Sequence, residues 1–145
     1  MEKDKLMSSV DPFQTIPHRH PFLLVDQVTS IDAGKKITGR KSISCNEWYF
    51  QGLPPSFMIV PASILSEAIA QLGAMLILNE AENQGKLIFF SGLDKVRFRK
   101  PVLPGEILEM SAEILRRKGR IGRLRVEAKV GEKLVFEGVM QFALE

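Results

Sequence analysis

The segment YFQGLPPSFMIVPASILSEAIAQLGAML, residues 49–76, contains a single acidic residue in a stretch that otherwise has the composition of a buried element. Glu67 is the only charged residue between Ala62 and Leu78. Apolar side chains recur there at three- and four-residue steps, which predicts a helix from about Ala62 to Glu82. Because nearly every position of this helix is apolar, other parts of the protein must surround it.

Strand-like stretches flank the predicted helix, two before it and four after it, with turn residues between them. They are Phe22–Ile31, Lys36–Cys45, Lys86–Phe98, Ile107–Arg116, Arg120–Val130 and Lys133–Leu144. A single antiparallel sheet must wrap around the helix to bury it. This pattern predicts an α+β protein with the hotdog fold, as one domain over residues 1–145. The sheet edge left at its margin favours a two-fold dimer.

Composition narrows the class of protein. The chain has 145 residues, of which 45% are hydrophobic and 26% charged, which is ordinary for a soluble globular domain. Its single cysteine, Cys45, excludes an internal disulfide and is compatible with a cytoplasmic location. No signal peptide and no apolar run of 18 residues is present, so we expect no membrane span. Basic residues cluster without interleaved aromatic residues, which argues against nucleic-acid binding.

Four motifs resemble those of the FabZ-type (3R)-hydroxyacyl-[acyl-carrier-protein] dehydratases. They are IPHRHPFLLVDQV (residues 16–28), NEWYFQG (46–52), SEAIAQLGA (66–74) and FFSGLDKVRFRKPVLPGE (89–106). The family patterns are LPHRYPFLLVDRV, NExFFxGH, EAMAQxxG and FxGIDxxRFxxPVxPGD, in the same order along the chain. This resemblance implies the hotdog fold and a role in fatty-acid or polyketide metabolism. It implies acyl carrier protein or an acyl thioester as the partner, and no metal or other cofactor.

The resemblance implies a catalytic pair of which this chain keeps only one member. In the family, a histidine removes the proton next to the thioester carbonyl, and a helix carboxylate supplied across the dimer interface completes the pair. Glu67 falls on that carboxylate, but Leu53 stands where the family has the histidine, directly after Gly52. The interval from Gly52 to Gln71 matches the family without insertion, so no shifted histidine lies nearby. Leucine cannot accept a proton, and we therefore expect impaired dehydration.

The chain's two histidines do not replace the missing one by position. His18 matches a family residue away from the reacting atoms, and His20 takes the place of a tyrosine, so a structural or surface role is expected for both. Of the two, His20 is the first to test as a substitute base. Resemblance places the remaining site residues as follows: oxyanion-binding N–H groups at Ala62 and Ser63; an acyl pocket at Phe57, Met58, Ile64, Phe89 and Phe90; and a carrier-protein docking surface at Lys95, Arg97, Arg99 and Lys100.

Four interpretations of Glu67 remain open from the sequence. The chain is an acyl-binding relative that dehydrates poorly, an active dehydratase with another base, or a thioesterase in which Glu67 activates water. The fourth interpretation makes Glu67 a buried polar residue bonded to Ser63 and Gln71, one turn away on either side. We expect a homodimer, with a trimer of dimers as the larger alternative.

Overall fold

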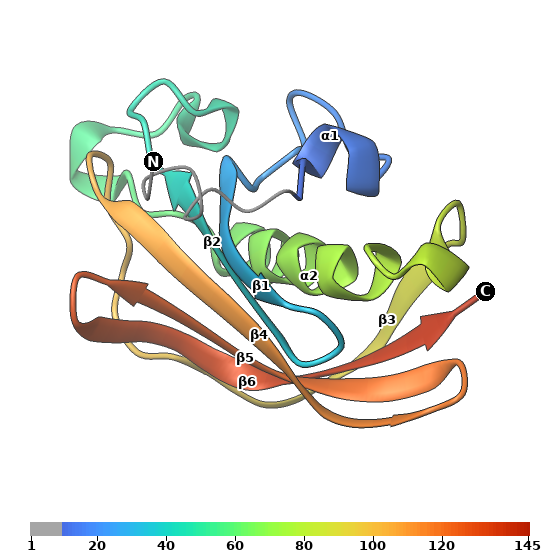
Figure 1. Cartoon of the computed structure of the whole chain (residues 1–145). Coiled ribbons are helices and arrows are strands. Elements are labelled where there is room, and N and C mark those ends of the chain that lie inside the picture. The colour runs from blue at the N-terminus through green and yellow to red at the C-terminus, as the bar shows by residue number, and fades with distance from the viewer. Residues whose placement is uncertain (1–9) are drawn as a thin grey trace, which may run out of the picture.

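The computed structural model describes residues 10–145, so the first nine residues of the predicted domain lie outside it. Figure 1 shows one curved sheet with a long helix on its inner side. The helices are α1 (Pro12–Thr15) and α2 (Ala62–Leu78), and short 3-10 turns occur at Trp48–Phe50, Pro55–Phe57 and Ala81–Asn83. The strands are β1 (Gln27–Asp32), β2 (Lys36–Ser42), β3 (Ile88–Phe98), β4 (Ile107–Lys118), β5 (Ile121–Val130) and β6 (Lys133–Leu144).

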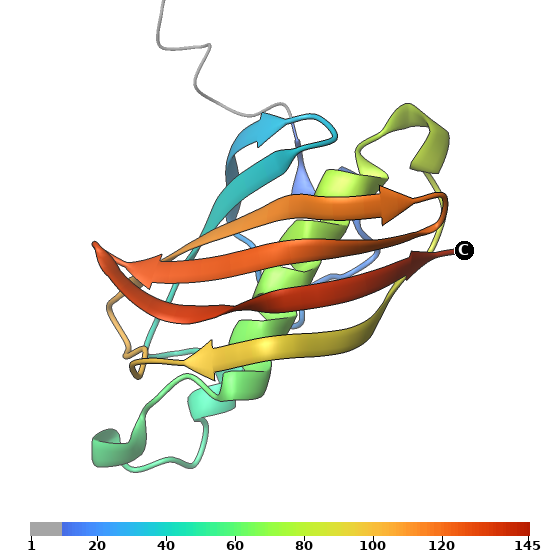
Figure 2. The same cartoon turned by 90° about the horizontal axis from the view of Figure 1, so that it is seen from below.

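The six strands form one antiparallel sheet in the order β1-β2-β4-β5-β6-β3. Buried and exposed residues alternate along the inner strands, as in β5, because successive side chains of a strand point to opposite faces. The buried face packs on α2, which the strands cross in Figure 2. The α+β hotdog fold expected from the sequence is confirmed.

The central helix is almost entirely enclosed. Of the 17 residues of α2, all from Ala68 onward are buried, and the N-terminal segment that carries α1 lies on the side away from the sheet. Glycines allow the close approach to the sheet, since a Cβ at Gly39 would come within 2.7 Å of Leu72 Cδ1 and one at Gly73 within 2.7 Å of Leu124 Cδ1. Where α2 crosses β2 and β5, the backbone of one element therefore packs directly against a leucine side chain of the other.

The helix ends four residues before the predicted position, at Leu78 instead of Glu82. The following sequence is polar and leaves the core, and the buried amide of Asn83 donates to the Ile77 carbonyl at 3.0 Å. That hydrogen bond satisfies one carbonyl that a longer helix would have used. Within residues 10–145, no helix is long and apolar enough to cross a membrane.

The first predicted strand also begins later than expected, at Gln27 instead of Phe22. The residues before it run along α2 and bond to a helix side chain: the Leu24 N–H donates to Gln71 Oε1 at 2.8 Å, and Gln71 Nε2 donates to the Phe22 carbonyl at 2.7 Å. Because these backbone groups are used by Gln71, they are not available to a neighbouring strand.

Candidate active site

Glu67 lies in the second turn of α2, where its carboxylate is held from one side. Gln71, one turn further along, donates from Nε2 to Glu67 Oε1 at 3.1 Å. Gln71 is itself buried and fixed by its two contacts to the backbone of Phe22 and Leu24. The predicted contact with Gln71 is therefore present, whereas Ser63 is exposed and makes no hydrogen bond to Glu67 in the described chain.

A histidine from the N-terminal segment faces the same carboxylate. Nε2 of His18 lies 3.6 Å from Glu67 Oε1, and the two side chains are 31% and 33% exposed. The other ring nitrogen, Nδ1, is buried without a partner in residues 10–145. The Phe22 ring lies beside the imidazole, with the centroids 6.3 Å apart. The pair is thus shielded from much of the solvent, yet it remains open on one side.

His20 occupies a different place. Together with Phe13, Leu23, Val25 and Asp26 it lines a separate hollow of about 210 Å³. The structure therefore brings His18, and not His20, to Glu67, which reverses the order of testing expected from the sequence. No local sequence signal identifies His18: its segment reaches Glu67 because the Gln71 amide fixes the backbone of residues 22–24 against the helix.

Leu53 lies in the loop between β2 and α2, which projects beyond the N-terminal end of the helix in Figure 2. Its N–H donates to the Phe50 carbonyl at 3.0 Å, following a turn in which Gly52 has φ +80°, a value that glycine adopts readily. The Leu53 side chain is 41% exposed. Residue 53, which the resemblance aligns with the family's histidine, is thus a half-exposed apolar side chain that cannot exchange protons.

An ionic cluster around the buried Lys41 lies at the start of this loop. Lys41 Nζ lies 2.7 Å from Glu47 Oε1 and 3.5 Å from Asp26 Oδ1, and the lysine is almost fully buried. The hydroxyl of Tyr49 is buried nearby without a hydrogen-bond partner. Burial, and secondarily the charges of Glu47 and Asp26, raise the pKa of Tyr49 well above its usual range.

The first turn of α2 offers unused hydrogen-bond donors. Pro61 precedes the helix and provides no side-chain cap, and its carbonyl accepts from Ile64 and Leu65. The N–H groups of Ala62 and Ser63 make no hydrogen bond in the described chain, and both residues are exposed. Because the positive end of the helix dipole lies here, these two N–H groups can bind an oxyanion.

A groove borders this helix start and is mainly apolar. It has a volume of about 360 Å³ and is lined by Ile59, Val60, Pro61, Ala62, Leu65, Phe98, Arg99, Lys100, Pro101 and Val102. Two of the predicted docking residues thus stand at the groove. Arg99 also pairs with Glu137 at 2.6 Å, and this hydrogen bond lowers the pKa of the Glu137 carboxyl. Lys100 has no ion-pair partner in residues 10–145.

The other two docking residues, Lys95 and Arg97, lie on β3 itself. Lys95 has φ +52°, an uncommon value for a residue other than glycine, within a bulge between Asp94 and Arg97. It lines a separate hollow of about 200 Å³ with Arg125, Glu127 and Glu137. Arg97 on β3 lies opposite Glu137 on β6 in the strand register. Three of the four cations, Lys95, Arg97 and Arg99, thus lie near Glu137, whereas Arg99 and Lys100 border the groove.

The predicted acyl-pocket residues also separate. Ile64 is buried, and Met58 and Phe90 pack against the core. Phe90 pairs with Phe142 on the inner face of β3, so the adjacent Phe89 points outward and is 50% exposed. Phe57 is 66% exposed in the loop. Phe89 therefore shares no pocket with Phe90, and only Met58, Ile64 and Phe90 adjoin the interior.

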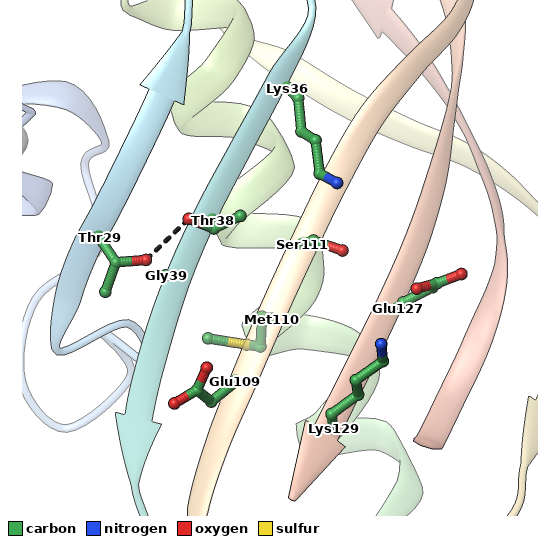
Figure 3. Close-up of a pocket in the computed structure, with 9 residues that line it drawn as sticks. All are labelled: Thr29, Lys36, Thr38, Gly39, Glu109, Met110, Ser111, Glu127 and Lys129. Carbon is green, nitrogen blue, oxygen red and sulfur yellow. Dashed lines mark hydrogen bonds between the residues drawn. The ribbon is translucent and has the colours of Figure 1, made fainter. Parts of the chain in front are cut away.

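A further hollow of about 280 Å³ on the sheet contains none of the predicted site residues. It is the pocket of Figure 3 and is lined by Thr29, Lys36, Thr38, Gly39, Glu109, Met110, Ser111, Glu127 and Lys129. Thr29 and Thr38 share a hydrogen bond of 2.8 Å at one side of it, between β1 and β2. Among residues 10–145, no group of three or more histidine, cysteine or acidic side chains could hold a metal ion.

Comparison with known proteins identifies the family. The FabA-like domain matches residues 16–139. The chain is 46% identical over 129 residues to a 3-hydroxyacyl-[acyl-carrier-protein] dehydratase FabZ of Moorella thermoacetica, covering 89% of this chain and 90% of the relative. It is 45% identical over 141 residues to the FabZ of Macrococcus caseolyticus, covering 97% of each. This chain belongs to the FabZ-type dehydratase family.

Solved structures agree on the fold at much lower sequence identity. The dehydratase heterocomplex ApeI:P from Xenorhabdus doucetiae aligns with a TM-score of 0.80 at 15% identity, over 95% of this chain and 93% of that chain. Cj0977 from Campylobacter jejuni, described as a sigma28-regulated virulence protein, aligns with a TM-score of 0.71 at 18% identity, over 91% of this chain and 92% of the other.

Proposed function

We propose that this FabZ-type protein binds acyl thioesters carried by acyl carrier protein, in cytoplasmic fatty-acid or polyketide metabolism, and dehydrates 3-hydroxyacyl groups poorly. The observation that carries the proposal is Leu53. A leucine at the position of the family's base removes general-base catalysis worth roughly 10² to 10⁴ in rate. The class of substrate is that of the related 3-hydroxyacyl-[acyl-carrier-protein] dehydratases.

Binding is supported by what the helix side of the site retains. The N–H groups of Ala62 and Ser63 are available for a thioester carbonyl, and the adjoining groove is mostly apolar with Lys100 at its margin. Apolar lining favours an acyl chain by about 0.8 kcal/mol for each buried methylene group. A cationic margin favours an acidic carrier protein.

We further propose a homodimer, with a trimer of dimers as the larger assembly. Strand β3 stands at one edge of the sheet and pairs with β6 alone. Leu93 and Phe98 on this strand are exposed, although both are large and apolar. An unpaired, apolar edge strand is a surface that another strand can cover. A monomer by light scattering at micromolar concentration would contradict this proposal.

The test of function combines a binding measurement with two product assays. Calorimetry with a non-reactive acyl-carrier-protein conjugate should show binding. Incubation with a 3-hydroxyacyl-carrier protein should yield little enoyl product by mass spectrometry. Rapid turnover that depends on Glu67 but not on residue 53 would refute poor dehydration. Release of free carrier-protein thiol, without enoyl product, would instead support the thioesterase interpretation.

A further inference from the structure

The pairing of Glu67 with His18 is a feature of one chain and does not involve position 53. Two histidines are present in the sequence, and only His18 faces Glu67. Since Nδ1 of His18 is buried without a partner in the described chain, Nε2 is the ring nitrogen that can exchange a proton with another group. Nε2 lies 3.6 Å from Oε1, and catalytic hydrogen bonds that are this long without a ligand often shorten when substrate binds.

The Glu67 carboxylate also keeps one oxygen free for a ligand among the described residues. Gln71 holds Oε1, whereas Oε2 makes no hydrogen bond within residues 10–145. Side chains of a helix lean toward its N-terminus, and Glu67 lies about 6–7.5 Å along the axis from the free N–H groups of Ala62 and Ser63. A carbonyl bound at such a helix start, in this chain or in the partner of the proposed dimer, would leave Oε2 free to reach the carbon beside it.

We propose that Glu67, backed by His18 of the same chain, removes and returns the proton on carbon 2 of a bound acyl thioester, so that the protein catalyses hydrogen exchange at that carbon without dehydration. This inference rests on the proposed binding of acyl thioesters. Glu67 is the catalytic residue of the exchange reaction. His18 acts only through Glu67: it positions the carboxyl group and passes its proton to water.

The exchange reaction balances without any co-reactant. The carbon 2 proton moves to the Glu67 carboxylate, and the electron pair of the broken C–H bond moves into the thioester, giving an enolate whose oxygen faces the Ala62 and Ser63 N–H groups. The Glu67 carboxyl group passes the proton to Nε2 of His18, and the partly exposed imidazolium exchanges it with water. Return of a hydron to carbon 2 restores the thioester. In D2O the net change is one C–H bond replaced by C–D.

Elimination requires more than this pair provides. A 3-hydroxyacyl group loses water only when a second group delivers a proton to the departing hydroxyl while the carbon 2 proton is held. The family assigns two residues to these tasks, and position 53 is now leucine. The proton that Glu67 takes from carbon 2 passes to His18 and then to water, so proton removal and return remain while no second group delivers a proton to the hydroxyl.

The experiment uses a saturated acyl thioester of N-acetylcysteamine, which has no 3-hydroxyl and cannot eliminate water. The full-length protein is incubated with it in D2O, loss of the carbon 2 proton signal is followed by NMR, and the Kd for the same thioester is measured by calorimetry. We expect exchange above the buffer rate. Glu67→Gln should lower it roughly 10²-fold or more, the scale of general-base catalysis.

His18→Gln should lower exchange roughly tenfold, the scale of one contact to a charged group, with the Kd for the thioester unchanged. Added imidazole should restore part of the rate of His18→Gly. His20→Gln is the matched control, since it changes the same residue type in the same segment but away from Glu67, and it should exchange like the wild type.

Each outcome bears on one proposal. Thioester binding without exchange above buffer would overturn the inference and leave the proposed function standing. No measurable binding by the wild type would instead defeat the proposed function. Equal exchange rates for His18→Gln and His20→Gln would overturn the role of His18. Because the retained Kd shows that a variant is folded, a loss of rate at unchanged Kd supports the pair.

Discussion

The helix side and the loop side of this site differ in the side chains that they present. On the helix side, Glu67, Gln71 and His18 form a connected polar group that is anchored by buried backbone contacts. On the loop side, the apolar side chains of Leu53, Phe57 and Ile59 are exposed to solvent. The helix side can hold a carbonyl and move a proton, whereas the loop side can contribute contact area only.

This difference separates binding from chemistry in physical terms. Hydrogen-bond donors at a helix start belong to the backbone, so almost any side-chain substitution leaves them in place. The N–H groups of Ala62 and Ser63 are donors of this kind. A base on a loop depends on one side chain, and a single change to leucine removes it. Fold membership therefore predicts binding better than it predicts turnover.

The largest expected effect comes from restoring the loop side with Leu53→His. An imidazole would stand at the family's base position, and dehydration of a 3-hydroxyacyl-carrier protein should rise by roughly 10-fold to 10²-fold. The full family rate is not expected, because the loop also differs at residues 56–58 and a displacement of about 1 Å can cost 10²-fold. Leu53→Gln is the control, being polar without a titratable group, and a similar gain from it would exclude base catalysis.

The next largest effect concerns the anchor of the helix side, Gln71. Gln71→Leu should remove both backbone contacts and leave the buried Leu24 N–H unpaired, at about 1–3 kcal/mol, whereas the Phe22 carbonyl belongs to an exposed residue and can bond to water. Chemical denaturation should therefore show a loss of about 1–3 kcal/mol. Gln84→Leu is the matched control, since Gln84 is exposed and outside the site. Similar stability of the two variants would show that Gln71 does not anchor the segment.

The same anchor explains where prediction from sequence succeeded and failed. Period-two and helical patterns located all six strands and the start of α2, because burial of one face imposes those periods. The end of α2 and the start of β1 were misplaced because side chains of Asn83 and Gln71 took over backbone groups there. His18 was missed for the same reason: its position depends on a tertiary contact that no local pattern encodes.

A smaller effect is expected on the loop side from Tyr49→Phe. The change removes a buried hydroxyl without a partner, so the free energy of unfolding at pH 7 should rise by about 1 kcal/mol. The pKa of Tyr49 is raised in the folded state, so above pH 10 the unfolded chain loses the phenolic proton first and stability falls by about 1.4 kcal/mol per pH unit. Tyr49→Phe should lack that fall.

Tyr49 is the only tyrosine in the chain, so its ionisation can be followed directly by tyrosinate absorbance. The folded protein should show no tyrosinate at pH 10.5, whereas the protein in denaturant should show it. Half-ionised tyrosine in the folded protein near pH 10 would contradict a buried, desolvated hydroxyl.

The smallest effect is expected at the groove beside the helix start, where two adjacent cations differ in their partners. Lys100 is free of ion pairs in the described chain, whereas Arg99 already pairs with Glu137 at 2.6 Å. Lys100→Glu should weaken carrier-protein binding a few-fold, since exposed charges contribute up to about 1 kcal/mol each, and should reduce the dependence of Kd on salt. Arg99→Gln should weaken binding less, because it also releases Glu137 and removes a cation whose charge was largely compensated.

Calorimetry at two salt concentrations separates the variants. A larger loss for Arg99→Gln than for Lys100→Glu would mean that Arg99 leaves Glu137 to contact the carrier protein, and unchanged affinity for both would place carrier-protein docking away from this groove.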